Sequence, residues 1–287
     1  MEKAAIIPAS GIGDALMMMI AAEACVRKGF KVTVFHDKIL SLRHWFPSVE
    51  IRPFSLKALQ ADVIYHQNDN TNRSYNLREK RWPHLITIFP TLEPQKHNPI
   101  MPQDIIFDPK QSLCDNLAST VSTNKETGMV PPPNLIYKKY RNRLIFHPAS
   151  GAAERNWPKK KYETLAKRLI KKGFEPCMCV APHERFLFPE SPLFPTYSDL
   201  AAFVYESGGL VGNDSSLGHL ASLFKLPTLT ISRSHKEIAL WRPGFFPGEV
   251  ITPPRFIPNL KGFRIREKYW KKFIQVNSVE KLINTNS

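Results

Sequence analysis

The chain has 287 residues, of which 43% are hydrophobic and 11% aromatic. This content is enough for a buried core and excludes disorder as the main state. The length suits two domains of ordinary size. No apolar run is long enough to span a bilayer, and Pro8 and Gly11 interrupt the first apolar run, so we expect no signal peptide. Only four cysteines are present, which excludes a disulfide framework and indicates a reducing compartment.

The formal net charge is +15, which predicts a negatively charged partner. The aromatic residues do not interleave with lysine and arginine in a nucleic-acid-binding signature, and no zinc-finger or RNP-like motif occurs. We therefore expect an anionic lipid or a nucleotide as the partner, and no nucleic acid.

Strands alternate with helices in the first half of the chain, which predicts a parallel sheet covered on both faces. We expect a helix over about residues 15–28, a short one near 39–45, and strands at 4–9, 31–35, 49–54 and 61–65. A glycine-rich turn, Ser10-Gly11-Ile12-Gly13-Asp14, separates the first strand from the first helix. Residues 102–134 are poorly periodic and contain three consecutive prolines, so we interpret them as the end of a first domain and a linker.

A second α/β series follows. We expect helices over about residues 162–170 and 198–206, and strands at 143–147, 176–180, 209–211 and 228–232. A last helix is predicted over 278–282, with Ser278 as its cap. The predicted domains are therefore residues 1–134, residues 135–265 and a C-terminal tail or helix at 266–287.

The stretch Gly212-Asn213-Asp214-Ser215-Ser216 lies between a buried strand and an amphipathic helix. Asp214 or Ser215 can cap this helix. Unpaired N–H groups and the helix dipole at such a terminus favour an anion, so the pattern predicts a phosphate site. An ordinary capped helix explains the same pattern.

Three stretches resemble motifs of glycosyltransferase family 9, the bacterial lipopolysaccharide heptosyltransferases. Residues 10–17, SGIGDALM, are similar to its G-x-G-D-x-L-M loop. Residues 147–158 resemble its H-x-(G/A)-(S/T)…K-x-W-P segment, and residues 212–221 resemble its G-x-D-(S/T)-G-x-x-H-L-A signature. The resemblance implies an α/β protein of the GT-B fold, in which two Rossmann-like domains with parallel sheets face each other across a cleft.

The resemblance also implies an activity. Members of the family transfer a sugar, typically a heptose from ADP-heptose, to a lipopolysaccharide core acceptor, with inversion and without a metal. The expected partners are a nucleotide-sugar donor held by the second domain and an anionic lipid-anchored saccharide held by the first. No cofactor is expected, and the protein would associate peripherally with an anionic membrane, at the cytoplasmic face of the inner membrane.

Roles are carried over motif by motif. Asp14 corresponds to the catalytic base; its alternative role is the N-cap of the first helix. The residues expected on the acceptor side are Gly11, Gly13, Arg73 and Arg78. The residues expected to bind the donor are Ser150, Gly151, Arg155, Asp214, Ser215, Ser216 and His219. Two positions depart from the family pattern, because Ser216 stands where glycine is usual and Arg155 where lysine is usual.

Other interpretations stay open. The donor could be another nucleotide sugar, the acceptor could be a protein, or the chain could bind a nucleotide or phosphate without catalysis. The tail combines basic and aromatic residues in a pattern typical of an interfacial surface, with solubility as the alternative explanation. These residues are Arg264, Arg266, Lys268, Tyr269, Trp270, Lys271, Lys272 and Phe273.

Overall fold

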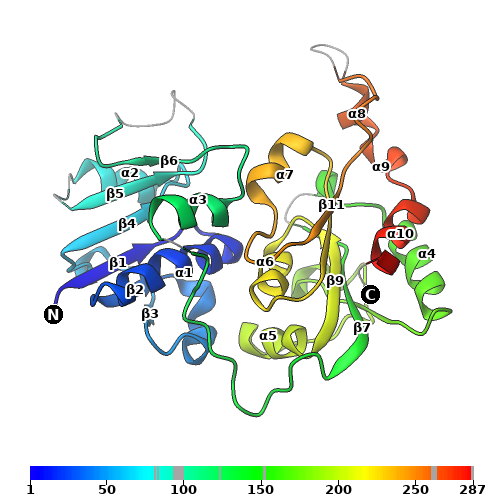
Figure 1. Cartoon of the computed structure of the whole chain (residues 1–287), viewed down its shortest axis with the longest axis horizontal. Helices are drawn as coiled ribbons and strands as arrows, with labels where there is room; N and C mark the ends of the chain where they lie inside the picture. Colours follow the sequence, from blue (N-terminus) through cyan, green and yellow to red (C-terminus); the bar gives the residue numbers. More distant parts are fainter. Residues whose placement is uncertain are drawn as a thin grey trace. The chain divides into compact units, whose positions relative to one another are not determined.

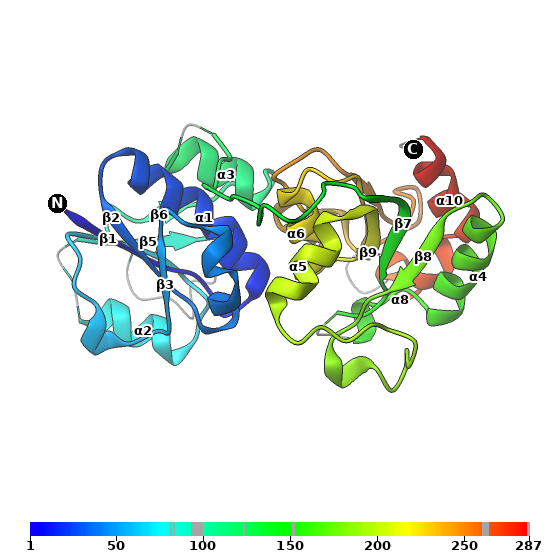
Figure 2. The same ribbon diagram turned by 90° about the horizontal axis from the view of Figure 1, so that it is seen from below.

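The computed structural model describes residues 1–80, 82, 84–92, 100–122, 124–150, 153–259 and 264–285, with side chains as far as Ile283. The chain divides into two compact units, Met1–Asn134 (unit 1) and Leu135–Ser287 (unit 2). Each unit is an α/β layer structure with one sheet (Figures 1 and 2). Within the described ranges, no helix combines the length and the apolar character needed to cross a bilayer.

Unit 1 contains a parallel sheet in the order β3-β2-β1-β4-β5-β6. Its strands are β1 (Lys3–Ile7), β2 (Lys31–Phe35), β3 (Glu50–Arg52), β4 (Val63–Gln67), β5 (Leu85–Phe89) and β6 (Ile105–Ile106). Its helices are α1 (Ile12–Arg27), α2 (Asn72–Glu79) and α3 (Leu113–Thr120), with 3-10 helices η1 (Asp37–Trp45) and η2 (Leu56–Ala58). Helix α1 is buried almost all round, as its continuous apolar sequence predicts.

Two helices of unit 1 lie where the sequence predicted none. Helix α2 has only Ser74 and Leu77 buried, so it shows no apolar period. Helix α3 lies in the region interpreted as domain end and linker, and that interpretation is wrong for residues 113–120. Ser112 caps α3 by accepting a hydrogen bond from the N–H of Asp115 (3.1 Å).

Unit 2 contains a second parallel sheet, in the order β11-β10-β9-β7-β8. Its strands are β7 (Tyr140–His147), β8 (Glu175–Met178), β9 (Ser207–Asn213), β10 (Thr228–Ile231) and β11 (Glu249–Ile251). The longer helices are α4 (Lys159–Ile170), α5 (Tyr197–Tyr205), α6 (Ser216–Leu223), α7 (His235–Trp241) and α10 (Val276–Thr285). Short turns are η3 (Ala153–Arg155), η4 (Pro182–Glu184), α8 (Ile265–Lys268) and α9 (Trp270–Phe273).

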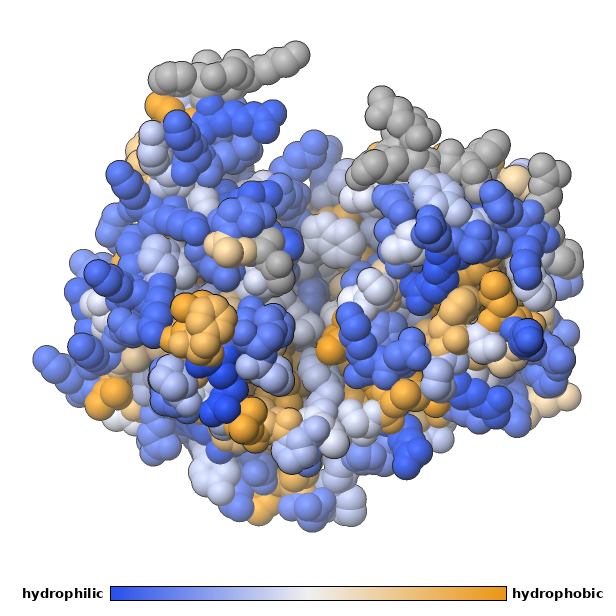
Figure 3. Space-filling model, turned by 180° about the vertical axis from the view of Figure 1, so that it is seen from behind, coloured by the Kyte–Doolittle hydropathy of each residue, from blue (hydrophilic) through white to orange (hydrophobic). Residues whose placement is uncertain are grey.

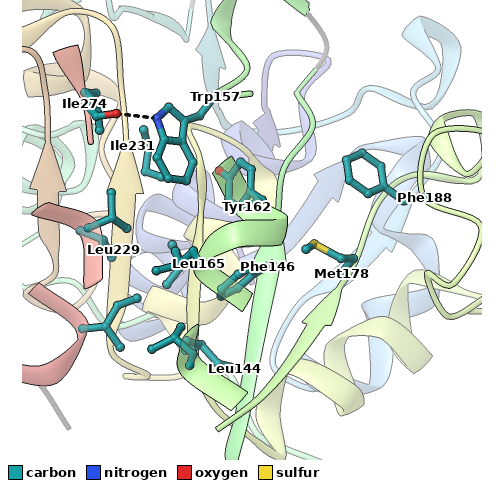
Figure 4. Packing of buried hydrophobic residues seen from close by; sticks show 14 of the residues in the cluster. Leu144, Phe146, Trp157, Tyr162, Leu165, Met178, Phe188, Leu229, Ile231 and Ile274 are labelled. Atoms are coloured by element: carbon teal, nitrogen blue, oxygen red, sulfur yellow. Dashed lines mark hydrogen bonds between the residues drawn. The ribbon is translucent and has the colours of Figure 1, made fainter. Parts of the chain in front are cut away.

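The core of unit 2 includes the C-terminal segment. Trp157 stacks edge-on against Tyr162 with ring centroids 5.0 Å apart, and its Nε1 donates to Ile274 O (3.1 Å; Figure 4). Trp270 and Ile274 are buried in the same cluster. Helix α10 begins at Val276, so the prediction that Ser278 caps it is wrong.

Strand order reverses once in each sheet. In unit 1, β1 has β2 on one side and β4 on the other; in unit 2, β7 lies between β8 and β9. At each of these points, the loops that follow the two neighbouring strands run in opposite directions. Ligands of open parallel sheets bind at such points, outside the carboxyl ends of the strands. Ligand sites are therefore expected at the β1/β4 edge of unit 1 and at the β7/β9 edge of unit 2.

Candidate functional site

Asp14 lies at the β1/β4 edge of unit 1, in the first turn of α1. Gln67, the last residue of β4, donates from Nε2 to Asp14 Oδ1 at 2.5 Å. Gln67 Oε1 accepts from the N–H of Ala9 in the loop after β1 (3.4 Å). The amide therefore joins the ends of the two strands and orients the carboxylate between them. Sequence reasoning missed Gln67; the available signal was an amide at the end of a predicted strand.

The alternative role of Asp14 as helix cap is not what the structure shows. The N-cap of α1 is Gly11, which makes no side-chain hydrogen bond, and Asp14 is the third residue of the helix. Gly11 has an ordinary backbone conformation (φ −77°) that any residue can adopt. The glycine matters because a side chain at this position has no room. A Cβ there would collide with Asp14 Oδ2. Gly13 is buried in the same turn.

Burial raises the pKa of Asp14 to about 6, because desolvation penalises the charged carboxylate. The hydrogen bond from Gln67 opposes this shift, and the nearby charge of Asp69 adds to it. A carboxylate with this pKa is ionised at neutral pH and still holds a proton better than an ordinary aspartate. These are the properties of a general base.

The two predicted acceptor-side arginines have different surroundings. Arg73 Nη2 donates to Pro8 O (2.7 Å) and to Asp69 Oδ2 (3.1 Å), and its side chain is 22% exposed. Arg73 therefore reaches the loop that leads into Asp14. Arg78 is 7% exposed and forms an ion pair with Asp104 (3.2 Å). Its charge is compensated by Asp104 inside unit 1. The acceptor-side role of Arg78 stays a prediction.

Two histidines lie at the same edge of the sheet, and the sequence analysis did not single them out. His66 is in β4, with Nδ1 3.4 Å from Ile7 O, and burial lowers its pKa to about 4. His36 follows β2 directly, and burial lowers its pKa as well. Both imidazoles are therefore neutral at pH 7, whereas Arg73 carries a positive charge beside the Asp14 loop.

Asn213 organises the β7/β9 edge of unit 2. The side chain is 2% exposed. Its Nδ2 donates to Pro148 O (2.7 Å), and its Oδ1 accepts from Trp157 N (3.0 Å) and Tyr162 OH (3.3 Å). One amide thus holds the loop after β7 to the end of β9. Asn213 lies in the motif at residues 212–221, but the sequence predicted no role for it.

Gly212, the preceding residue of β9, allows this approach. A Cβ at position 212 would lie 2.9 Å from His147 Cβ and 3.0 Å from His147 O. The motif segments 147–158 and 212–221, which are distant in sequence, therefore meet within unit 2.

The loop after β7 carries other predicted donor residues. Ser150 Oγ donates to Asn156 Oδ1 (2.6 Å), and Arg155 is exposed at the end of η3. The predicted donor residue Gly151 lies outside the described residues.

The N-terminus of α6 presents buried polar atoms. Ser215 occupies the N-cap position, although its side chain makes no cap hydrogen bond. Ser215 Oγ and His219 Nδ1 are buried, and neither has a hydrogen-bond partner in the described part of the chain. Burial lowers the pKa of His219 to about 4, so the ring is neutral. Buried polar atoms without partners are costly, and this pair therefore indicates a ligand with polar atoms of its own.

The remaining predicted residues surround this terminus. Asp214 and Ser216 are half-buried, and Ser216 is the first residue of α6. Gly218, His219 and Ser222, which share the polar face of α6, are buried like its apolar residues. Ser222 Oγ accepts from Phe246 N (3.0 Å).

Comparison with known proteins supports the fold. No protein-family model matches the sequence, and the comparison with curated proteins finds no match. Solved structures do match. E. coli heptosyltransferase WaaC with ADP has a TM-score of 0.71 at 15% identity, covering 99% of this chain and 100% of that one. A glycosyl transferase family 9 protein from Veillonella parvula has a TM-score of 0.71 at 15% identity, covering 99% and 96%.

A third match is E. coli ADP-heptose lps heptosyltransferase II, with a TM-score of 0.66 at 15% identity, covering 99% of this chain and 98% of that one. The predicted α/β fold of two Rossmann-like units is therefore confirmed. The fold of the chain is similar to that of these three glycosyltransferase structures.

We expect Asp14→Asn to stabilise the protein at pH 7.5 by about 2 kcal/mol, after allowance for solvent screening. Folding raises the pKa of this acid from 3.8 to about 6, so the folded protein binds the proton more tightly than the unfolded chain. Wild-type stability relative to the variant should fall as pH rises from about 4 to about 6. Urea unfolding at several pH values measures the difference. A variant that is less stable at pH 7.5 would contradict the pKa shift.

We expect Asn213→Ala to destabilise unit 2 by about 3 kcal/mol, because it leaves Pro148 O, Trp157 N and Tyr162 OH without this partner. The control is Asn142→Ala on β7, an exposed amide whose loss should change stability by less than about 0.5 kcal/mol. Tryptophan fluorescence during urea unfolding compares the two. Equal effects would show that Asn213 does not organise the loops.

Proposed function

We propose that the chain is an inverting glycosyltransferase that transfers a heptose, or a related sugar, from an ADP-sugar to a lipopolysaccharide core acceptor. The observation that carries the proposal is the Asp14 carboxylate, held by Gln67 with a pKa of about 6. The fold agrees with it, since the matched E. coli structures are heptosyltransferases, one of them with ADP.

In the proposed reaction, an acceptor hydroxyl attacks the anomeric carbon of the donor sugar. Asp14 accepts the hydroxyl proton as the new C–O bond forms, while the bond to the diphosphate breaks and the diphosphate leaves with the electron pair. A single displacement of this kind inverts the anomeric centre. Gln67 occupies Oδ1, so we assign proton transfer to Oδ2, where the missing side chain of Gly11 leaves space.

Unit 1 is the proposed acceptor side. Arg73 is partly exposed beside the loop of Asp14 and keeps donor groups for a phosphate of the acceptor. Gly11 and Gly13 shape the turn that the acceptor hydroxyl approaches. A lipid-anchored acceptor agrees with the net charge of +15, and we propose peripheral binding at the cytoplasmic face of the inner membrane.

Residues 135–265 are the proposed donor side. Ser215 Oγ and His219 Nδ1 would bond oxygen atoms of the nucleoside diphosphate, with the first N–H groups of α6 behind them. Asp214 would orient a donor hydroxyl, and Ser150, Gly151 and Ser216 would line the pocket. Arg155 is exposed and would neutralise the leaving diphosphate, so the proposed mechanism requires no metal or cofactor.

Two alternatives remain distinguishable by experiment. The donor could carry another base or sugar, or the acceptor could be a protein. The alternative of a non-catalytic nucleotide binder rests on the two departures from the family pattern, Ser216 at the first position of α6 and Arg155. ADP release on addition of a rough-core acceptor separates an enzyme from a binder.

We expect Asp14→Asn to lower turnover by about 1,000-fold or more while ADP affinity persists, because the variant cannot accept the proton. The wild-type rate should rise with pH around a midpoint of about 6. Gln67→Leu should move that midpoint upward, since the hydrogen bond from Gln67 lowers the pKa of Asp14. Asp37→Asn, an exposed aspartate at the start of η1, is the control and should leave the profile unchanged. Near-normal turnover of Asp14→Asn would contradict the assignment of Asp14 as the general base.

We expect Ser215→Ala to weaken ADP binding about 10-fold, because the variant loses one hydrogen bond to a charged group. The substitution should not destabilise the free protein. The matched control is Ser222→Ala in the same helix. Ser222 Oγ has partners in Phe246, so its loss should reduce stability and leave ADP affinity unchanged. Calorimetry with ADP, UDP and GDP measures affinity and base preference. A reversed pattern, with Ser222→Ala alone weakening ADP binding, would exclude the proposed phosphate contact.

A further inference from the structure

The segments at residues 255–259 and 264–272 form a basic and aromatic surface on unit 2. Arg266 Nη1 donates to Arg255 O (3.1 Å), and Asn259 Nδ2 donates to Glu267 Oε1 (2.8 Å), so the two segments lie side by side. Figure 1 shows α8 projecting from the rest of unit 2. The exposed basic and aromatic residues of the two segments, which we call the basic-aromatic surface, are Arg255, Phe256, Arg264, Lys268, Tyr269 and Lys272.

This surface has a strong charge imbalance. Among the described residues of the two segments there are six cations and one carboxylate, Glu267. Glu267 is already engaged, since Asn259 donates to it and Arg264 lies 3.5 Å away. In Figure 3 the projection at upper left, below the grey atoms, is mainly hydrophilic with a small hydrophobic patch at its margin. The complementary partner is an extended anionic surface.

Aromatic side chains stand among the cations. Phe256 is 87% exposed and Tyr269 is 40% exposed. Lys268 Nζ and Lys272 Nζ each lie 5.4 Å from the centroid of the Tyr269 ring. Cations beside aromatic rings are the arrangement that suits a lipid headgroup layer, where rings enter the acyl boundary and charges meet phosphates.

Hydrogen bonds attach the basic-aromatic surface to the rest of unit 2. Trp270 is 3% exposed, and its Nε1 donates to Glu154 O (3.3 Å). Lys271 Nζ donates to Ala153 O (3.2 Å). These bonds tie the surface to η3, the turn that ends at Arg155. A partner that binds the surface would therefore lie beside the turn that carries a proposed donor residue.

We propose that the basic-aromatic surface docks unit 2 on an anionic lipid bilayer. The choice of a lipid partner rests on the proposed lipid-anchored acceptor, and one observation favours it over double-stranded nucleic acid. Helices α8 and α9 have four residues each, too short to fill a nucleic-acid groove.

Vesicle flotation tests the proposal with the full chain. We expect binding to mixed phosphatidylcholine–phosphatidylglycerol vesicles and none to phosphatidylcholine alone. Each cation near the surface contributes about 5-fold, so Lys268→Gln with Lys272→Gln should weaken binding about 30-fold. Phe256→Ser should also weaken binding and should remove the part that survives high salt.

The matched control is Lys167→Gln with Lys171→Gln, two exposed cations on and just after α4. It removes the same charge elsewhere on unit 2 and should retain vesicle binding. Equal losses in both pairs would overturn the proposal, because net charge alone would then explain binding. Binding to single-stranded RNA tighter than to the vesicles, and lost in the Lys268/Lys272 pair, would overturn it in favour of nucleic acid.

Turnover with a delipidated, soluble acceptor separates this proposal from the proposed function. The Lys268/Lys272 pair should keep the wild-type rate on that acceptor while losing vesicle binding. If the wild type binds vesicles as expected but transfers no sugar, the docking surface stands and the proposed function fails. If it transfers sugar and does not bind anionic vesicles, the docking surface fails and the function stands.

Discussion

Asn213 makes three hydrogen bonds from one buried side chain, to Pro148 O, Trp157 N and Tyr162 OH. These bonds connect the ends of β7 and β9 in the unit 2 sheet, at the point where strand order reverses. The loop after β7 takes its conformation from them, and Trp157 is held in the core that the C-terminal segment completes. This amide therefore links the motif segments 147–158 and 212–221 directly.

The corresponding amide of unit 1, Gln67, plays a similar part with a different consequence. It joins the end of β4 to the loop after β1, and its other end contacts a carboxylate that burial keeps from ionising at its usual pH. Burying Asp14 destabilises the charged form, and an exposed N-cap aspartate would avoid this cost. Functional sites often contain buried charged groups that destabilise the fold, because a raised pKa makes a carboxylate a better proton acceptor. In unit 2, Ser215 Oγ and His219 Nδ1 have the same character, since both are buried without a hydrogen-bond partner among the described residues.

Patterns along the sequence were informative where local chemistry and tertiary structure agree. Strand β2 has the predicted bounds, because its alternating valines face the core on one side. Helix α4 buries Tyr162, Leu165 and Leu169 at helical spacing, as its sequence indicates. Helix α2 escaped prediction because burial of one leucine, Leu77, and a cap from Thr71 are enough to stabilise it within the domain. The same limit explains Arg78: its sequence shows a cation, and only the fold brings Asp104 to it.

The sequence by itself determined the fold class, the glycine-rich turn at residues 10–14 and the candidate residues Asp14, Ser215 and His219, because strand and helix periods and local motifs depend on near neighbours along the chain. Tertiary structure alone decided which groups these residues meet. Gln67 reaches Asp14 across 53 positions, and Asn213 reaches Pro148 across 65. Such distances along the chain are closed by the order of strands in a sheet. The pKa of Asp14 and the neutrality of His219 follow from burial, which a residue's own sequence neighbourhood does not specify.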